Sequence, residues 1–238
     1  MKLKDILTPS FRTLRQELGL PRASKPVVQV SADSDFCHEV VAKGWLTEGQ
    51  MAHAAERYRL GRSKSGRCIF WMIDEMGRVN DGHIGDSWVS AMLKAREPAL
   101  LKDCQTRHCL LGLHQLKNEK NKELKNKTSV AVVESERSAV VLSELLPQNI
   151  WMASVYLMNL NVGTLQPLCG HRVVLFPPTD ETGETFLAWL EVADQARRVL
   201  HLDISVSAVL EERATEEEKR RRIDILEFML RSEAVGSS

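Results

Sequence analysis

The chain has 238 residues, 43% of them hydrophobic, and its 32 basic and 32 acidic side chains give a formal net charge of zero at pH 7. That apolar fraction supports a folded core and excludes a largely disordered chain. Zero net charge excludes a global positive field that would attract a polyanion. We therefore expect one large domain or two small ones, and any nucleic-acid site must come from local clustering of charge.

The cysteines and the N-terminal segment bear on the compartment. The five cysteines are scattered without a CxxC pair, which argues against a zinc ribbon and fits a reducing cytoplasm. The N-terminal segment is amphipathic and contains acids, so it lacks the apolar core of a signal peptide. No apolar run approaches the roughly 18 residues of a membrane span. We expect a soluble, cytoplasmic protein without a membrane partner.

The first part of the chain predicts a helix and a linker. Apolar side chains recur at helical spacing over residues 4–19. The segment that follows begins with Pro21 and is rich in polar residues, which is typical of a linker. We therefore assign residues 1–30 to an N-terminal helix and linker.

The next segment predicts a pair of helices and a hairpin. Residues 34–58 have the pattern of two short helices, and Thr47 with Gln50 forms a capping box at the start of the second. The apolar, β-rich run 68–74 leads into a glycine-containing turn. We therefore expect a β-hairpin over residues 67–83.

A helical segment and a charged segment complete this part. Residues 86–96 have a helical pattern, whereas residues 117–127 are charged and have no apolar face. The charged stretch is either a solvated loop or a basic arm that contacts phosphate. Together these elements predict a small α+β subdomain over residues 31–127.

Strand-like and helix-like segments alternate from residue 128 onward. The apolar runs expected to be strands are 128–133, 150–154, 172–176 and 202–206. The segments expected to be helices are 136–146, 182–200 and 215–231. This alternation is typical of a parallel sheet. We therefore expect an α/β domain with a doubly wound, mostly parallel sheet over residues 128–232, followed by a disordered tail at 233–238.

Four carboxylates occupy places where such a sheet gathers functional groups, the carboxyl ends of its strands. Glu134 directly follows the first strand, Asp180 and Glu181 follow the third, and Asp224 follows the basic run of the last helix. Clustered carboxylates need a neutralising cation, and oxygen ligands favour Mg²⁺ or Mn²⁺, which serve phosphoryl transfer. The alternative is that Glu134 and Asp180 are ordinary helix N-terminal residues, favoured by the helix dipole.

Two strand–acid–helix segments resemble motifs of the Toprim family. The first Toprim motif, a buried strand ending in a glutamate before a helix, resembles VAVVESERSAVVLSELL. The second, a strand followed by an Asp-x-Asp pair and a glycine, resembles VVLFPPTDETGETFLAWL, with Asp180 at the second aspartate and Gly183 at the glycine. In Toprim proteins the glutamate is a general acid/base and the aspartates bind magnesium. The resemblance implies these roles for Glu134 and Asp180, with Glu181 or Asp224 as substitute ligands.

The order of the upstream segments is similar to that of bacterial primases, so the resemblance covers residues 44–230. Residues 66–84 resemble the primase hairpin, and residues 109–116 resemble the segment before the Toprim domain. The wording FWxIDxxGRV followed by VAVVESE is similar to a primase-like family of unknown function carried by mobile elements. The resemblance implies a Toprim-like fold, a single-stranded or primed nucleic acid as partner, and contacts with replication or mobilisation proteins.

The hairpin carries the candidate nucleic-acid contacts. Lys64, Arg67 and Arg78 flank it, and the resemblance implies that this basic subdomain guides a template strand. Arginine can pair bidentately with phosphate, and Trp71 could stack on a base. The alternative is that Trp71 packs inward and the charges are solvated.

The sequence also departs from the family pattern. Pro178 stands where the first aspartate is expected, and the cysteine-rich zinc module of many primases is absent from this sequence. Val155 and Tyr156 stand where the family tends to have glycines, which would let the backbone approach a phosphate or metal. These departures predict a degenerate metal site.

Three functions remain open. The first is a primase-like protein that binds DNA or RNA for the replication or transfer of a mobile element, with little or no catalysis. The second is an active magnesium-dependent nucleotidyltransferase of the DNA primase type. The third is a non-catalytic scaffold for protein contacts, since fold alone does not decide function.

Overall fold

The computed structural model describes residues 29–96, 108–120 and 129–235. The chain divides into two compact units, residues 1–119 and 120–238. The helix expected at residues 4–19 and most of the charged stretch 117–127 lie outside the described residues. None of the described helices is long and apolar enough to cross a membrane.

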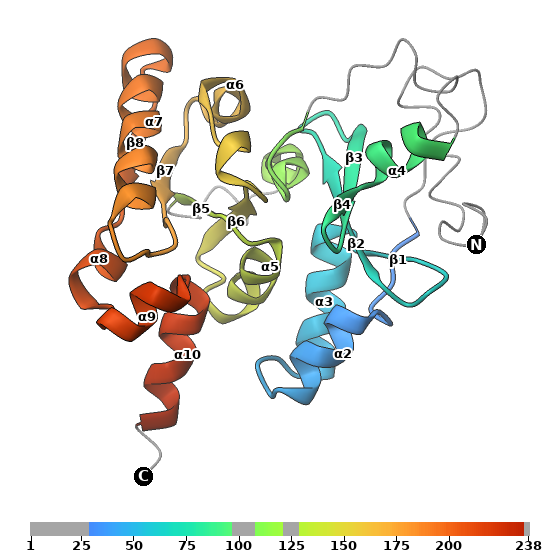
Figure 1. Ribbon diagram of the computed structural model, residues 1–238. Coiled ribbons are helices and arrows are strands. Elements are labelled where there is room, and N and C mark those ends of the chain that lie inside the picture. The colour runs from blue at the N-terminus through green and yellow to red at the C-terminus, as the bar shows by residue number, and fades with distance from the viewer. Residues whose placement is uncertain (1–28, 97–107, 121–128, 236–238) are drawn as a thin grey trace. The chain divides into compact units, whose positions relative to one another are not determined.

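The first unit combines helices with an antiparallel sheet of order β1-β2-β3-β4 (Figure 1). Its elements are α2 (Asp35–Ala42), α3 (Glu48–Tyr58), β1 (Gly61–Arg62), β2 (Cys68–Ile73), β3 (Val79–Ile84), β4 (Ser87–Trp88), α4 (Val89–Arg96) and the 3-10 helix η3 (Leu113–Lys120). The capping box predicted at Thr47 and Gln50 is confirmed, because each side chain accepts a hydrogen bond from the other residue's backbone N–H at the start of α3. The predicted hairpin is β2 and β3, which pair antiparallel.

The second unit is an α/β domain. Its elements are β5 (Ser129–Val133), α5 (Glu136–Leu145), β6 (Asn149–Ala153), η5 (Leu157–Asn159), α6 (Val162–Leu165), η6 (Gln166–Leu168), β7 (Arg172–Leu175), α7 (Glu184–Leu200), β8 (Asp203–Val206), α8 (Val209–Arg213), α9 (Glu216–Arg221) and α10 (Ile225–Val235). The four strands form one sheet of order β6-β5-β7-β8, in which every pair is parallel. The prediction of an α/β fold with a parallel sheet is therefore confirmed.

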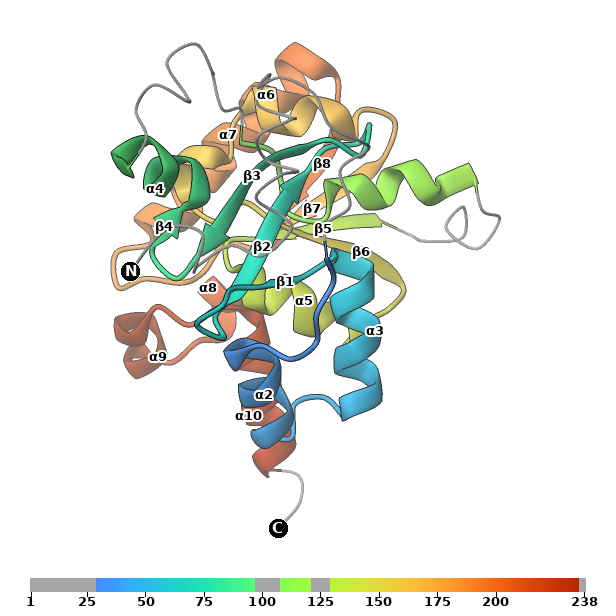
Figure 2. The same ribbon diagram turned by 90° about the vertical axis from the view of Figure 1, so that its right-hand side faces the viewer.

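The apolar residues of β5 explain its central place in this sheet. Four of its five residues are buried, as expected for a strand covered on both faces. Helices α5 and α7 lie on opposite sides of the strands (Figure 2), which is the arrangement that right-handed crossovers produce when they run in opposite directions. The strand order therefore reverses at β5 and β7, and the carboxyl ends of these two strands form a topological switch point.

The helix predicted at 215–231 is instead two helices, α9 and α10. The break falls at Arg222, whose backbone is left-handed (φ 55°, ψ 48°) and ends α9. Asp224 then accepts hydrogen bonds from the backbone N–H groups of Leu226 and Glu227 and so starts α10. Because α10 continues to Val235, the tail expected at 233–238 begins inside this helix.

Candidate functional site

The switch point brings the ends of β5 and β7 together. The two strands pair in register, with Val130 opposite Val173 and Val132 opposite Leu175. Glu134 follows β5 directly, and the loop after β7 leads to Asp180. Strands from the two predicted motifs are thus neighbours in one sheet, and open α/β sheets bind ligands at this edge.

Glu134 is half-buried in mixed charge. Burial raises the pKa of its carboxyl, while the positive charge of Arg222 and the backbone N–H of Leu157 act in the opposite direction. Asp224 and Glu136 add two further negative charges that raise this pKa. A carboxyl whose pKa is raised by burial is a candidate for proton transfer.

The neighbouring strand ends in a strained backbone. Val155 follows β6 with φ at 71°, a conformation that is a genuine outlier for a β-branched residue. It is held there because the backbone N–H groups of Ser154 and Val155 donate to the carbonyls of Val133 and Glu134, at 3.0 and 2.9 Å. Position 155, where the family tends to have glycine, thus has a glycine-like backbone with a valine side chain. Such strain costs roughly 1–3 kcal/mol and concentrates at functional sites.

Ser154 supplies a second unusual feature at the same edge. The residue is 1% exposed, and its hydroxyl has no hydrogen-bond partner among the described residues. A buried polar group without a partner carries a desolvation cost of about 1–3 kcal/mol. The strained Val155 and this hydroxyl therefore mark the edge beside Glu134 as a candidate ligand site.

Asp180 caps helix α7. Its Oδ1 accepts from the N–H and hydroxyl of Thr182, at 2.9 and 2.8 Å, and from the N–H of Glu184, at 3.3 Å. Its Oδ2 accepts from the N–H of Thr185 at 2.7 Å. Partial burial would raise the pKa of this carboxyl, but the hydrogen bonds from Thr185 and Thr182 hold it well below its usual range. Asp180 thus has the role of a helix N-terminal residue.

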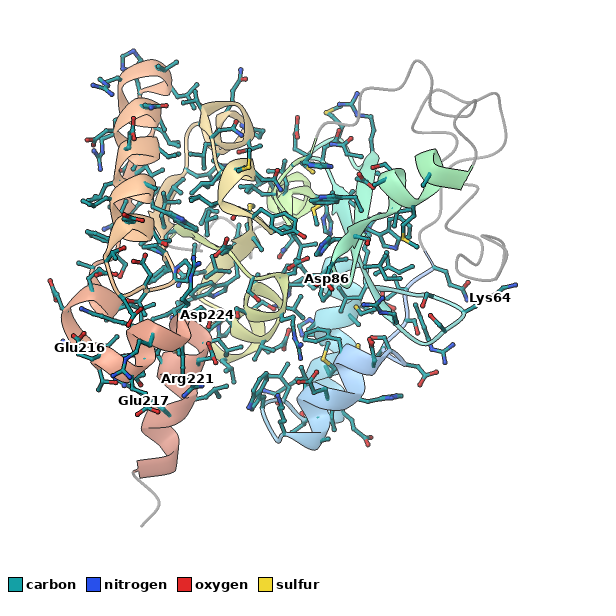
Figure 3. All side chains as sticks on the ribbon, in the orientation of Figure 1. Lys64, Asp86, Glu216, Glu217, Arg221 and Asp224 are labelled. Carbon is teal, nitrogen blue, oxygen red and sulfur yellow. The ribbon has the colours of Figure 1, made fainter. Side chains whose placement is uncertain are left out.

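Glu181 and Asp224 also have other partners. Glu181 is exposed and lies 3.7 Å from the Nε of Arg220. Asp224 is 9% exposed and lies ahead of α10 (Figure 3). Besides starting α10, its carboxylate accepts a hydrogen bond from the hydroxyl of Ser138 on α5. Of the three proposed metal ligands, only Asp224 has a charge that acts on Glu134.

These contacts do not fit the magnesium site that the Toprim resemblance implies. A carboxylate has about four acceptor positions, and Asp180 already receives four hydrogen bonds. Within the described ranges, no group of three or more His, Cys, Asp or Glu side chains is placed to hold a metal ion. The four acids expected to converge therefore separate into a capping residue, an exposed ion pair, and the Glu134–Asp224 pair.

Two of the predicted basic contacts are exposed in the first unit. Lys64 projects from the turn between β1 and β2 (Figure 3). Arg67 is exposed, and its guanidinium lies against Gly85, which follows β3. Arg78 pairs with the carboxylate of Asp74 (Nε–Oδ2 2.7 Å) at the hairpin turn. Lys64 and Arg67 thus remain candidates for phosphate contact, while Arg78 also stabilises the turn.

Trp71 is not available to stack on a base, which corrects the prediction made from the sequence. The residue is 0% exposed. Its indole lies over two glycines of neighbouring strands, because a Cβ at Gly61 would be 2.4 Å from its Nε1 and a Cβ at Gly82 would be 2.8 Å from its ring. Trp71 is therefore a core residue whose space depends on these two glycines.

The structure also shows a buried cluster that sequence reasoning missed. Asp81 is 0% exposed; its carboxylate accepts from the N–H and hydroxyl of Ser90 and lies 3.2 Å from Nε2 of His108. The His108 ring stacks on Trp88 with ring centres 3.8 Å apart. No sequence signal links positions 81 and 108. Arg222 and Ser154 were likewise missed, because neither belongs to a motif.

Comparison with known proteins identifies a family. Residues 35–179 match the family described as Domain of unknown function (DUF6371). The match includes the hairpin and Glu134 and ends one residue before Asp180. Neither a curated protein nor a solved structure shows significant similarity to the chain.

Proposed function

Because the chain belongs to the DUF6371 family, whose description names no activity, we propose its function from the candidate site. It is a primase-like protein with a Toprim-like fold that binds single-stranded or primed DNA or RNA. It acts in the replication or transfer of a mobile element, with a metal site that is degenerate.

One observation carries the proposal: Glu134, the strained Val155 and the unpaired hydroxyl of Ser154 lie together at the switch point. The order of strands and the glutamate directly after β5 support the Toprim-like fold. The exposed Lys64 and Arg67 support nucleic acid as the ligand, because phosphate contacts from such side chains dominate non-specific affinity.

Binding to a labelled single-stranded oligonucleotide, followed by fluorescence anisotropy over a salt series, tests the proposal. We expect affinity to fall steeply with salt. Replacing both Lys64 and Arg67 with alanine should lower the slope of log K against log salt by about 2, close to one unit per lost phosphate contact. Arg198→Ala, which removes an exposed charge from α7, is the matched control and should leave the slope unchanged.

A second candidate, the nucleotidyltransferase, is favoured by the raised pKa of Glu134, which suits a general acid/base. Synthesis of short RNA on a single-stranded template with Mg²⁺ or Mn²⁺, abolished by Glu134→Gln, would establish this activity. Binding without synthesis supports the binding protein. Absence of binding at low salt would refute both and leave the scaffold.

A further inference from the structure

Segment 222–224 crosses the carboxyl edge of the parallel sheet and is fixed from two sides. The carbonyl of Ile223 accepts a hydrogen bond from the N–H of Thr179 at 3.0 Å, which ties the segment to the loop after β7. The hydroxyl of Ser138 donates to Asp224, which ties it to α5. Ile223 is 2% exposed, so the segment is anchored in the core between these contacts.

This anchoring places the guanidinium of Arg222. Its Nη2 lies 3.5 Å from the hydroxyl of Thr185 at the start of α7, and its backbone is fixed because its N–H donates to the carbonyls of Glu218 and Lys219. Its charge acts on Glu134, which follows β5. Arg222 therefore lies between the loop after β7 and the end of β5, the place that a shared cation would occupy.

The other basic residues of the same run have different partners. Lys219 lies 3.9 Å from Glu216 within α9, Arg220 lies 3.7 Å from Glu181, and Arg221 lies 3.6 Å from Glu227. Arg222 is thus the member of the run whose charge acts on Glu134.

We propose that Arg222 is the resident counter-ion of the acidic edge formed by Glu134, Glu136 and Asp224, in place of a divalent cation. Three carboxylates near one another need a positive charge to remain ionised. An arginine remains protonated at every physiological pH, so it supplies this charge permanently. The edge is then complete without metal, which agrees with the use of the Asp180 oxygens in capping α7.

A double-mutant cycle on the full chain tests this pairing. The folding equilibrium constants of the wild type, Glu134→Gln, Arg222→Gln and the double variant are measured by urea denaturation. We expect Arg222→Gln to lower the constant about 3- to 20-fold more when Glu134 is present than when it is replaced, the range usual for interacting residues. Arg59→Gln is the matched control, since Arg59 also ends its helix in a left-handed conformation (φ 53°) in the first unit; its coupling to Glu134 should be absent.

Binding of Mn²⁺, measured by the loss of the free-ion electron paramagnetic resonance signal, tests the other half of the proposal. We expect equimolar wild-type protein to leave the signal unchanged. A coupling indistinguishable from one, or stoichiometric Mn²⁺ binding that Glu134→Gln abolishes, overturns the proposal. Should Arg222→Gln fail to fold, Arg222→Asn repeats the cycle, because asparagine tolerates the left-handed backbone. Neither measurement uses nucleic acid, so failure here is distinct from failure of the proposed function.

Discussion

The left-handed backbone of Val155 predicts that glycine is a better replacement than alanine at this position. In an ordinary strand, glycine is less stable than alanine by about 0.5–1 kcal/mol because it loses more freedom on folding. At a left-handed position an L-residue is disfavoured by roughly 1–2 kcal/mol, which glycine avoids. Since φ of Val155 is 71°, Val155→Gly should be as stable as Val155→Ala, or more stable by up to about 1 kcal/mol.

Val133 provides the reference position. It is buried like Val155, but it lies in β5 and is not among the described residues with positive φ. The glycine–alanine difference at 133, subtracted from that at 155, cancels the extra buried carbon and the unfolded-state entropy. The remainder estimates the left-handed strain, which we expect to be about 1–2 kcal/mol.

Urea denaturation followed by far-UV circular dichroism measures the four variants under one condition. All four should be less stable than the wild type, because each removes buried carbons at about 0.8 kcal/mol per methylene. A remainder within about 0.3 kcal/mol of zero, near the limit of additivity between independent sites, would show that the backbone at 155 is unstrained. Strain would then no longer mark the edge beside Glu134.

Two further predictions concern His114 and Asp180. Burial lowers the pKa of His114 from 6.5 to about 4, against the effect of its hydrogen bond to the carbonyl of Arg57. The unfolded chain therefore takes up the proton first, and stability is lost as pH falls below 6.5. Between pH 7 and 5 this loss amounts to about 2 kcal/mol, and His114→Gln should remove it from the pH dependence of urea unfolding; an unchanged dependence would contradict the assignment. Asp180→Ala should cost about 1–2 kcal/mol of stability because it uncaps α7, whereas Glu181→Ala should cost less than about 1 kcal/mol because its ion pair is exposed. Equal costs in urea unfolding would argue against the capping role.

Local patterns predicted most of the fold. Thr47 and Gln50 announced α3 because a capping box satisfies backbone groups through neighbours three residues apart. The apolar run at 128–133 announced β5 because a strand buried on both faces needs continuous hydrophobicity. The break between α9 and α10 was missed because nothing in the residue type of Arg222 signals a left-handed conformation.

The site was predicted less completely because it depends on contacts between distant residues. Glu134 was found because it directly follows a strand. The capping role of Asp180 was the alternative reading of its position, and its hydrogen bonds to the start of α7 favour that alternative. The burial of Trp71 depends on Gly61 and Gly82 in adjacent strands, a relation that appears only once the sheet is paired.

The register of β7 and β8 bears on how this protein should be divided for study. The family match ends at residue 179, but β8 pairs with β7 from Arg172 to Leu175. A fragment cut at the family boundary would leave the backbone N–H and C=O groups of β7 as an open edge, which is a template for aggregation. It would also remove Asp224 from Ser138. The cooperative folding unit is therefore larger than the region by which the family is recognised.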